Sequence, residues 1–222
     1  MNNNYKEAFE KTKIAGSIAA GALDEVNKIV KPGVSTSEID KICYEYINDN
    51  KAYSAPLFYR GFPKSCCTST NHVVCHGIPS DKILRDGDIV NVDVTAFKDG
   101  WHGDTSRMFK IGDISIKGEK LIKTTYESMM KGINIVKEGI HLGDIGSAIQ
   151  THVEAQGFSV VQDFCGHGIG ETFHKGARVI SSTNRNFEGR QGPRVKTHIA
   201  APETVAASAV SGFITAHNHE GH

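Results

Sequence analysis

One linker motif occurs twice in this chain, 106 residues apart, and it limits the possible folds more than any other feature of the sequence. Val30-Lys31-Pro32-Gly33-Val34 corresponds to Val136-Lys137-Glu138-Gly139-Ile140. Helical periodicity precedes the first copy over Ile14–Val30, and Ser35 with Glu38 forms a capping-box pattern that predicts a second helix. The second copy is also flanked by two predicted helices. This pattern favours a duplicated fold with one helix pair in each half, and two ordinary helix pairs that share a linker type are the alternative.

A β-hairpin is predicted after the first helix pair. Apolar residues dominate Ile89–Phe97 and Trp101–Phe109, and the Lys98-Asp99-Gly100 sequence between them is typical of a turn. After the second helix pair, Phe158–Phe164 is predicted to form a strand. A related half would continue with a second hairpin near residues 195–215, but that stretch is rich in alanine and predicts a short helix. We therefore expect the duplication to be interrupted there.

Charge and cysteine content restrict the class of function. The 222 residues include 25 basic and 25 acidic side chains, so the net charge predicts no affinity for nucleic acid or for anionic membranes. No apolar stretch is long enough to span a membrane, and Met1–Lys13 lacks the apolar core of a signal peptide. The five cysteines form no CxxC pair, which argues against a disulfide framework or a zinc knuckle. We expect a cytoplasmic protein.

Two aspartates of the predicted hairpin are candidate metal ligands. Asp93 lies in the first strand and Asp104 in the returning strand, and their midpoint falls between Lys98 and Asp99, so they should lie nearly opposite each other. Opposed carboxylates repel each other, and burial increases the repulsion. Exposure to water, a shared proton or a bridging cation would each relieve it. From the hairpin alone, a metal site and a solvated face are equally open.

Three histidines lie in sequences that suit a metal or substrate site. His167 is flanked by glycines within Cys165–Gly170, which would let the backbone approach a ligand closely. His174 follows seven residues later, and His76 comes after a short apolar run. A single histidine is more often a structural residue than a ligand. Two aspartates together with one histidine offer the oxygen and nitrogen donors that suit Zn, Mn, Co or Fe(II).

An ordered series of motifs resembles one enzyme family, from about residue 6 to His174. The motifs are Lys31–Thr36 (KPGVST), Gly61–Ser65 (GFPKS), Asn71–Pro79 (NHVVCHGIP), Asp86–Val94 (DGDIVNVDV), His102–Ser106 (HGDTS), Phe158–Val161 (FSVV) and Cys165–Gly170 (CGHGIG). Over this stretch the sequence closely resembles the type I methionine aminopeptidases of bacteria. The resemblance implies a mixed α/β (α+β) fold of the pita-bread type, whose two halves are related by a pseudo-two-fold axis.

The resemblance also implies a metal-dependent reaction. The family removes the N-terminal methionine of nascent peptides with a metal-bound hydroxide, at a centre that holds two divalent ions. Asp93, Asp104 and His167 match ligands of that centre, in which Asp93 would bind bidentately and Asp104 would bridge. His174 matches the residue that polarises the scissile carbonyl, and His76 matches one that orients the substrate. The implied partners are peptides with N-terminal methionine and a ribosomal surface, and the implied state is a monomer.

Four further residues match the pocket that receives the methionine side chain in the family. They are Tyr59, Phe62, Cys67 and Phe173. Ordinary core packing is the alternative role for all four. Pro56 occupies a position where the bacterial pattern commonly has a cysteine, so this wall of the pocket departs from the family.

The resemblance to the aminopeptidases ends near His174. The family has two more ligands, glutamates of an Ile-Glu-Pro segment and a Phe-Glu-His segment, and neither segment is present. Instead, residues 178–214 resemble the C-terminal part of the large subunit of 3-isopropylmalate dehydratase. The sequence thus predicts an aminopeptidase-like domain over residues 1–177, with an incomplete C-terminal half, and an unrelated tail over residues 178–222.

The number of matching ligands determines the activity that we expect. Asp93, Asp104 and His167 supply three protein donors, which suffice for one ion but not for two tightly held ions. We therefore expect one bound ion or none, and impaired removal of methionine. An inactive fold that still binds peptides and a non-functional hybrid chain are the alternatives.

Overall fold

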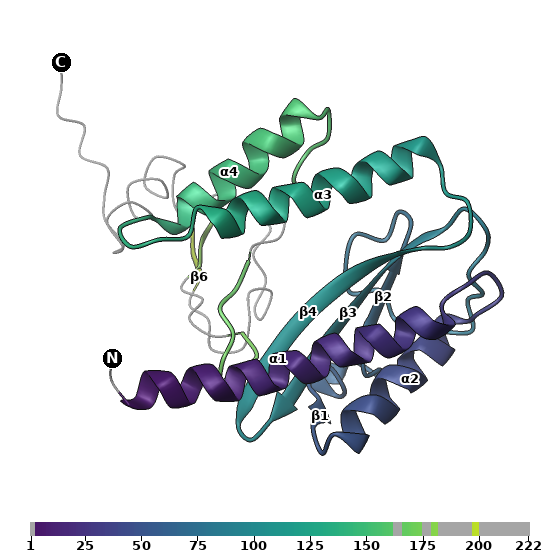
Figure 1. Ribbon diagram of the computed structural model, residues 1–222, viewed down its shortest axis with the longest axis horizontal. Helices are drawn as coiled ribbons and strands as arrows, with labels where there is room; N and C mark the ends of the chain where they lie inside the picture. Colours follow the sequence, from purple (N-terminus) through teal and green to yellow (C-terminus); the bar gives the residue numbers. More distant parts are fainter. Residues whose placement is uncertain (1–2, 162–165, 175–178, 182–196, 200–222) are drawn as a thin grey trace. The chain divides into compact units, whose positions relative to one another are not determined.

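The computed structural model describes residues 3–161, 166–174, 179–181 and 197–199 (Figure 1). Their contacts divide the chain into two units. The first unit comprises Met1–Glu119 and Gly168–Lys175, and the second comprises Lys120–His167 and Gly176–His222. The boundary predicted after residue 177 stays a prediction, because most of the tail lies outside the described residues.

The first unit contains two helices, a four-stranded antiparallel sheet and a short 3-10 helix. The elements are α1 (Asn3–Ile29), α2 (Thr36–Asp49), β1 (Tyr53–Ser54), η1 (Tyr59–Gly61), β2 (Cys67–Thr70), β3 (Ile89–Lys98) and β4 (Trp101–Lys110). β3 is the central strand, because β1 and β2 pair with one of its edges and β4 pairs with the other. Helices α1 and α2 lie on one face of the sheet (Figure 1).

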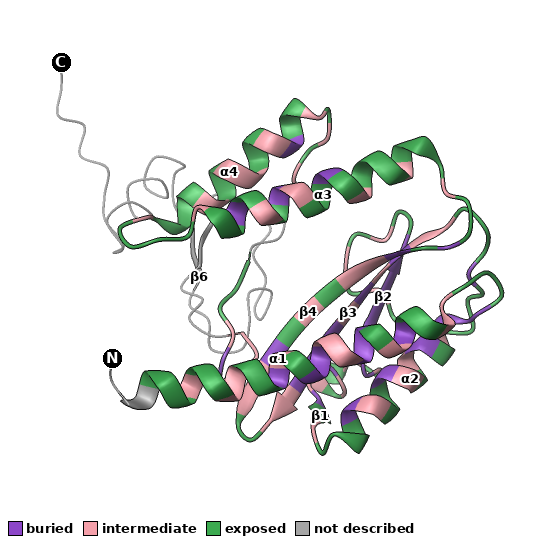
Figure 2. Ribbon diagram, in the orientation of Figure 1, coloured by how far each residue is buried: buried purple, intermediate pink, exposed green. Residues whose placement is uncertain are grey.

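The alternation of residues along β3 separates a core face from a polar face. Val90, Val92 and Val94 are fully buried in the cluster that β3 forms with α1 and α2, and the buried stretches of these elements face one another in Figure 2. Burial of each valine contributes roughly 1.5–3 kcal/mol. Because side chains alternate between the faces of a strand, Asp93 and Thr95 lie on the opposite face from the valines.

The hairpin turn is tighter than the sequence predicted. Asp99 and Gly100 both have positive φ, 49° and 86°, and they are the two residues between the paired Lys98 and Trp101. This is the two-residue turn that suits the twist of antiparallel strands. The predicted hairpin is confirmed, but its centre lies between Asp99 and Gly100, one residue beyond the predicted centre.

Helix α1 crosses β4 at Gly103. A Cβ atom at this position would overlap the backbone of Ala15 and Gly16 in α1. The helix can therefore approach the strand only because residue 103 has no side chain. Gly103 directly precedes Asp104. Two adjacent residues of β4 therefore contact α1 on one face of the sheet and carry the carboxylate on the other.

The repeated linker motif has the same backbone structure in both copies. Gly33 and Gly139 have φ values of 96° and 88°, which glycine adopts without strain. The Val34 amide donates to the Lys31 carbonyl, and the corresponding Ile140 amide donates to the Lys137 carbonyl. The duplication inferred from the sequence therefore extends to the conformation of the linkers.

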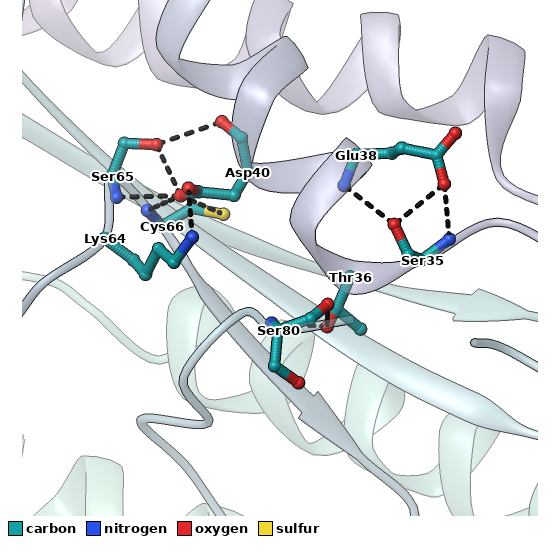
Figure 3. A network of polar contacts seen from close by, with 8 residues as sticks. All are labelled: Ser35, Thr36, Glu38, Asp40, Lys64, Ser65, Cys66 and Ser80. Atoms are coloured by element: carbon teal, nitrogen blue, oxygen red, sulfur yellow. Dashed lines mark hydrogen bonds and ion pairs between the residues drawn. The ribbon is translucent and has the colours of Figure 1, made fainter. Parts of the chain in front are cut away.

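The helix that follows each linker is capped in an equivalent way. The Ser35 amide donates to the Glu38 carboxylate at 2.7 Å, and the Glu38 amide donates back to the Ser35 hydroxyl at 3.2 Å (Figure 3). At the positions 106 residues later, the His141 amide donates to the Asp144 carboxylate at 2.9 Å. The predicted capping box is confirmed. The second copy has the equivalent hydrogen bond from the N-cap amide to a carboxylate three residues later.

The second unit contains most of α3 (Ile116–Asn134), α4 (Leu142–Ala155) and a parallel pair of short strands, β5 (Val179–Ser181) and β6 (Thr197–Ile199). Gly132 of α3 packs against the side chain of Ile149 in α4. None of the helices in the described part of the chain is long and apolar enough to cross a membrane.

One prediction of secondary structure in this unit is wrong over the residues that the structure describes. Phe158–Val161 forms no strand, and the Phe158 amide instead donates to the Val153 carbonyl at the end of α4. Residues 162–164 of that prediction lie outside the described residues. Of residues 195–215, where a short helix is predicted, the structure describes Thr197–Ile199, which forms β6, and the alanines on which the prediction rests lie outside the described residues.

Candidate functional site

Asp93 and Asp104 lie on the same face of the β3–β4 hairpin, diagonal to each other. The register pairs Asp93 with Ser106 and Asp104 with Thr95. The two aspartates were expected nearly opposite each other, and the partner of Asp93 lies two positions beyond Asp104, because the turn centre lies one residue further along the chain. Diagonal neighbours on one face remain within reach of each other, and the charge of Asp104 acts on Asp93.

The electrostatics of this pair suit a cation. Burial, and after it the charge of Asp104, raise the pKa of Asp93 to about 7. A divalent ion would replace the proton of Asp93 and remove the repulsion between the carboxylates. The donor chemistry of Asp93 and Asp104 therefore fits the metal that the sequence resemblance implies.

Thr95 orients the second carboxylate. Its buried hydroxyl donates to Asp104 Oδ1 at 3.0 Å. The motifs of the sequence did not point to Thr95. The available signal was its position two residues after Asp93, which places it on the same face of β3.

Cys67 lies on the β2 side of the carboxylates. It pairs with Asp93 across the sheet and is buried. Burial, followed by the charges of Asp93 and Asp104, raises the pKa of the Cys67 thiol to about 12. The thiol is therefore neutral near physiological pH, which suits the lining of an apolar pocket better than a nucleophile.

The loop after β2 carries His76. Burial and the nearby charge of Asp93 raise the pKa of the Cys75 thiol, so the loop passes close to the carboxylates. His76 has a φ of 54°, and the next residue, Gly77, lies so close to the Thr68 carbonyl that no side chain would fit. A non-glycine residue in this left-handed conformation occurs more often at functional sites than elsewhere.

His174 belongs to an aromatic cluster that joins distant parts of the sequence. Its Nδ1 lies 2.8 Å from the Tyr59 hydroxyl, and the Tyr59 ring packs edge-on against Phe173 at 4.8 Å between centroids. Phe173 also stacks on His102 of β4 at 5.5 Å and 11°. The backbone amide and Nδ1 of His102 each lie 2.8 Å from the Gly170 carbonyl oxygen. Residues 168–174 are thus attached to η1 and to the start of β4.

Fewer contacts define the positions of Phe62 and His167, the remaining predicted site residues. Phe62 is half-buried directly after η1, and its carbonyl accepts a hydrogen bond from the Phe58 amide. His167 belongs to the second unit, whereas Asp93 and Asp104 belong to the first, so its role as a third ligand stays a prediction. Within the described parts of the chain, no three His, Cys, Asp or Glu side chains form a metal-binding group.

Asp40 of α2 anchors the backbone that leads into β2. Its Oδ1 accepts hydrogen bonds from the Ser65 amide, the Ser65 hydroxyl and the Cys66 amide at 2.7, 2.6 and 3.2 Å (Figure 3). The Lys64 ammonium lies 3.7 Å from the other oxygen. This network fixes the start of β2 immediately before Cys67.

Comparison with known proteins identifies the family. The profile of metallopeptidase family M24 matches residues 10–204. The methionine aminopeptidase of Escherichia coli K12 is 55% identical over 181 residues, which cover 81% of this chain and 69% of that protein. The methionine aminopeptidase of Rickettsia prowazekii is 53% identical over 173 residues, 78% of this chain and 67% of that protein. The chain belongs to metallopeptidase family M24, among its type I methionine aminopeptidases.

The M24 assignment also confirms the fold class and the kind of enzyme. The crystal structure of the Rickettsia prowazekii methionine aminopeptidase matches with a TM-score of 0.76 over 78% of this chain and 69% of that one. The mixed α/β pita-bread fold predicted from the sequence is therefore confirmed, and by family the chain is a metalloexopeptidase. The M24 profile extends past residue 177 to residue 204. The resemblance of residues 178–214 to a dehydratase stays a prediction.

Proposed function

We propose that this chain removes the N-terminal methionine from peptides with the help of a divalent cation held by Asp93, Asp104 and His167. The observation that carries the proposal is the carboxyl pair on the polar face of the β3–β4 hairpin, in which the partial burial of Asp93 and the charge of the exposed Asp104 raise the pKa of Asp93 to about 7. A bound cation would relieve the repulsion between the two carboxylates. When bound, the cation would activate water and withdraw electrons from the scissile carbonyl.

The side chains around the carboxyl pair have separate proposed roles in this reaction. His174 donates a hydrogen bond to the oxygen of the scissile carbonyl, and His76 orients the peptide. Tyr59, Phe62, Cys67 and Phe173 surround the methionine side chain. The neutral thiol of Cys67 and the contacting rings of Tyr59 and Phe173 support an apolar pocket next to the carboxylates.

We also propose that turnover is slow and that the enzyme acts in the cytoplasm. Asp93, Asp104 and His167 are three donors in matching motifs, and the family pattern adds two glutamates that have no match in this chain. A cation would therefore have fewer protein ligands here than in the family pattern. The four cysteines of the described residues, Cys43, Cys66, Cys67 and Cys75, are free thiols, which supports a reducing compartment.

The test is release of methionine from Met-Ala-Ser with Mn²⁺ or Co²⁺, compared with the same chain in a chelator. We expect slow, cation-dependent release that falls by at least about 100-fold in Asp104→Asn. The matched control is Asp113→Asn, an exposed carboxylate outside the site, which should leave the rate unchanged. Release that is unaffected by the chelator or by Asp104→Asn would refute the proposal. Peptide affinity without a cation and without turnover would instead support a binding protein.

A further inference from the structure

His102 of β4 contacts two residues of the segment that carries His174. Its backbone amide and its Nδ1 each lie 2.8 Å from the Gly170 carbonyl oxygen. Its ring also stacks on Phe173, with 5.5 Å between the centroids and 11° between the planes. Gly170 and Phe173 are the two ends of a short stretch of chain, and His174 follows directly. One imidazole therefore holds both ends of the stretch that leads into His174.

The side chain of His102 adds to what the backbone alone provides. Any residue except proline at position 102 would donate its amide to the Gly170 carbonyl. A carbonyl oxygen can only accept, so the imidazole Nδ1 carries a proton and gives this oxygen a second hydrogen bond. Gly170 is buried, and a hydrogen bond is stronger in a buried site than in water. The same bond sets the plane of the ring that stacks on Phe173.

His102 lies on the same face of β4 as Asp104. The two residues are two positions apart, and they pair with Phe97 and Thr95 of β3. Their side chains therefore point to the same side of the sheet. The Phe97 ring contacts the His102 ring at 4.6 Å between centroids and supports it from the neighbouring strand. A single strand thus carries both the contacts to the His174 segment and one member of the carboxyl pair.

The aromatic contacts continue from His102 to His174. Phe173 packs against the His174 ring at 4.5 Å and against the Tyr59 ring at 4.8 Å. The Tyr59 hydroxyl lies 2.8 Å from His174 Nδ1. A displacement of Phe173 would therefore disturb the surroundings of His174 on both sides.

We propose that His102 is a positioning residue, whose imidazole holds residues 170–174 against β4 so that His174 keeps its place relative to the carboxyl pair. The meaning of that place for the reaction rests on the proposed function. The attachment of the segment to β4 is a property of the chain alone, and it can be measured without cation or substrate.

Three substitutions of His102 separate the two contacts of its imidazole. His102→Phe keeps a ring for the stack and removes the donor, whereas His102→Asn keeps an amide donor and removes the ring. His102→Ala removes both. If His102→Ala does not fold, the two milder variants carry the same test. His72→Ala is the matched control, since His72 is exposed in the turn after β2.

Fluorine NMR of chains labelled with 3-fluorotyrosine reports the attachment directly. The Tyr59 signal is the one that disappears in Tyr59→Phe, and its position in Phe173→Ala marks the loss of the aromatic contact. We expect His102→Ala to move this signal toward its position in Phe173→Ala. His102→Phe and His102→Asn should give smaller shifts, and His72→Ala none. A Tyr59 signal that all three substitutions of His102 leave in its wild-type position would overturn the inference.

A double-mutant cycle tests whether His102 acts through His174. In the aminopeptidase assay with Mn²⁺, His102→Ala should lower kcat by about 10-fold, the scale of one lost orienting hydrogen bond, with little change in KM or in Mn²⁺ affinity. In the His174→Ala background, the same substitution should have almost no further effect. Effects that multiply, or a loss of Mn²⁺ affinity, would show that His102 acts through Asp104 or the whole fold and would overturn the inference. If wild type releases no methionine, the proposed function fails, while the fluorine spectra still decide the attachment.

Discussion

Thr95 and Asp104 face each other across the β3–β4 ladder, and the threonine hydroxyl donates to the aspartate carboxylate at 3.0 Å. A carboxylate that binds a metal needs a fixed orientation, and a neighbouring hydrogen-bond donor provides it. Asp104 is therefore oriented in the absence of a cation by a residue of the strand that carries Asp93.

Replacement of this donor should weaken cation binding without unfolding the chain. Thr95→Val keeps the shape of the side chain and removes the hydroxyl, and we expect Mn²⁺ affinity to fall by about 10-fold. Isothermal titration calorimetry would measure the change. The control is Thr70→Val, because the Thr70 hydroxyl is buried without a hydrogen-bond partner in the described part of the chain. Thr70→Val should leave affinity unchanged, and equal affinity in both variants would contradict the role of Thr95.

Cation binding should release a proton at acidic pH. The pKa of Asp93 is raised to about 7, so at pH 6 this carboxyl is mostly protonated, and a bound cation would displace its proton. Calorimetry in two buffers of different ionisation enthalpy should detect about one released proton per bound cation at pH 6, and a much smaller number at pH 8. Equal proton release at both pH values would show that Asp93 does not exchange a proton for the cation.

The stability of the cation-free chain should fall as the pH rises from about 4 to about 7. The unfolded pKa of an aspartate is about 3.9, and the folded pKa of Asp93 is higher, so in this window the folded chain binds more protons. Melting temperatures in a chelator should decrease over this window by an amount on the order of 5 °C. Asp93→Asn should remove the decrease, whereas Asp113→Asn should retain it. A slope that survives in Asp93→Asn would assign the effect to another group.

Two glycines that meet at the contact between α1 and β4 should respond oppositely to substitution. Gly103→Ala places a methyl group against the backbone of α1 and should destabilise the fold by about 3 kcal/mol, the upper end of the usual cost of overpacking. Gly16→Ala has open space around the new methyl group and should stabilise α1 by about 0.5–1 kcal/mol. Urea unfolding measures both. Comparable effects of the two substitutions would show that the helix does not lie against Gly103 as described.

The hydrogen bonds that Asp40 accepts at the start of β2 should contribute more to the unfolding free energy than its ion pair with Lys64. Asp40→Ala leaves the Ser65 and Cys66 amides without their acceptor, while the Ser65 hydroxyl keeps the backbone carbonyl of Asp40, and we expect a loss of about 2–4 kcal/mol of unfolding free energy. Lys64→Ala removes only an ion pair at 3.7 Å and should cost less than about 1 kcal/mol. Chemical denaturation of both variants tests the order, and a larger cost for Lys64→Ala would reverse the interpretation.

Local patterns in the sequence predicted the hairpin, the two helix pairs and the first capping box. The capping of α2 depends on Ser35 and Glu38, which lie three residues apart, so its signal is contained in one turn of helix. The exact pairing of Asp93 was not predictable to the residue, because it depends on whether the turn uses two residues or more. An error of one residue in the turn centre moves the partner across the ladder by two.

Contacts between residues far apart in the sequence could not be predicted from local patterns. His102 was missed because its partners, Gly170 and Phe173, come from a segment about 70 residues later and meet it only in the folded chain. Thr95 was missed for a related reason, because its hydrogen bond to Asp104 depends on the register of the two strands. The failed strand at Phe158–Val161 shows that apolar residues with strand propensity form a strand only where a partner edge exists.

The close approach of α1 to Gly103 links the N-terminal helix to the chemistry on the far side of the sheet. A shift of α1 toward β4 would press on the backbone of Gly103, the residue next to Asp104, and through the charge of Asp104 it would alter Asp93 as well. Substitutions inside α1 that never touch a ligand are thus able to change how tightly the enzyme retains its cation, and screens for cation affinity should include that helix.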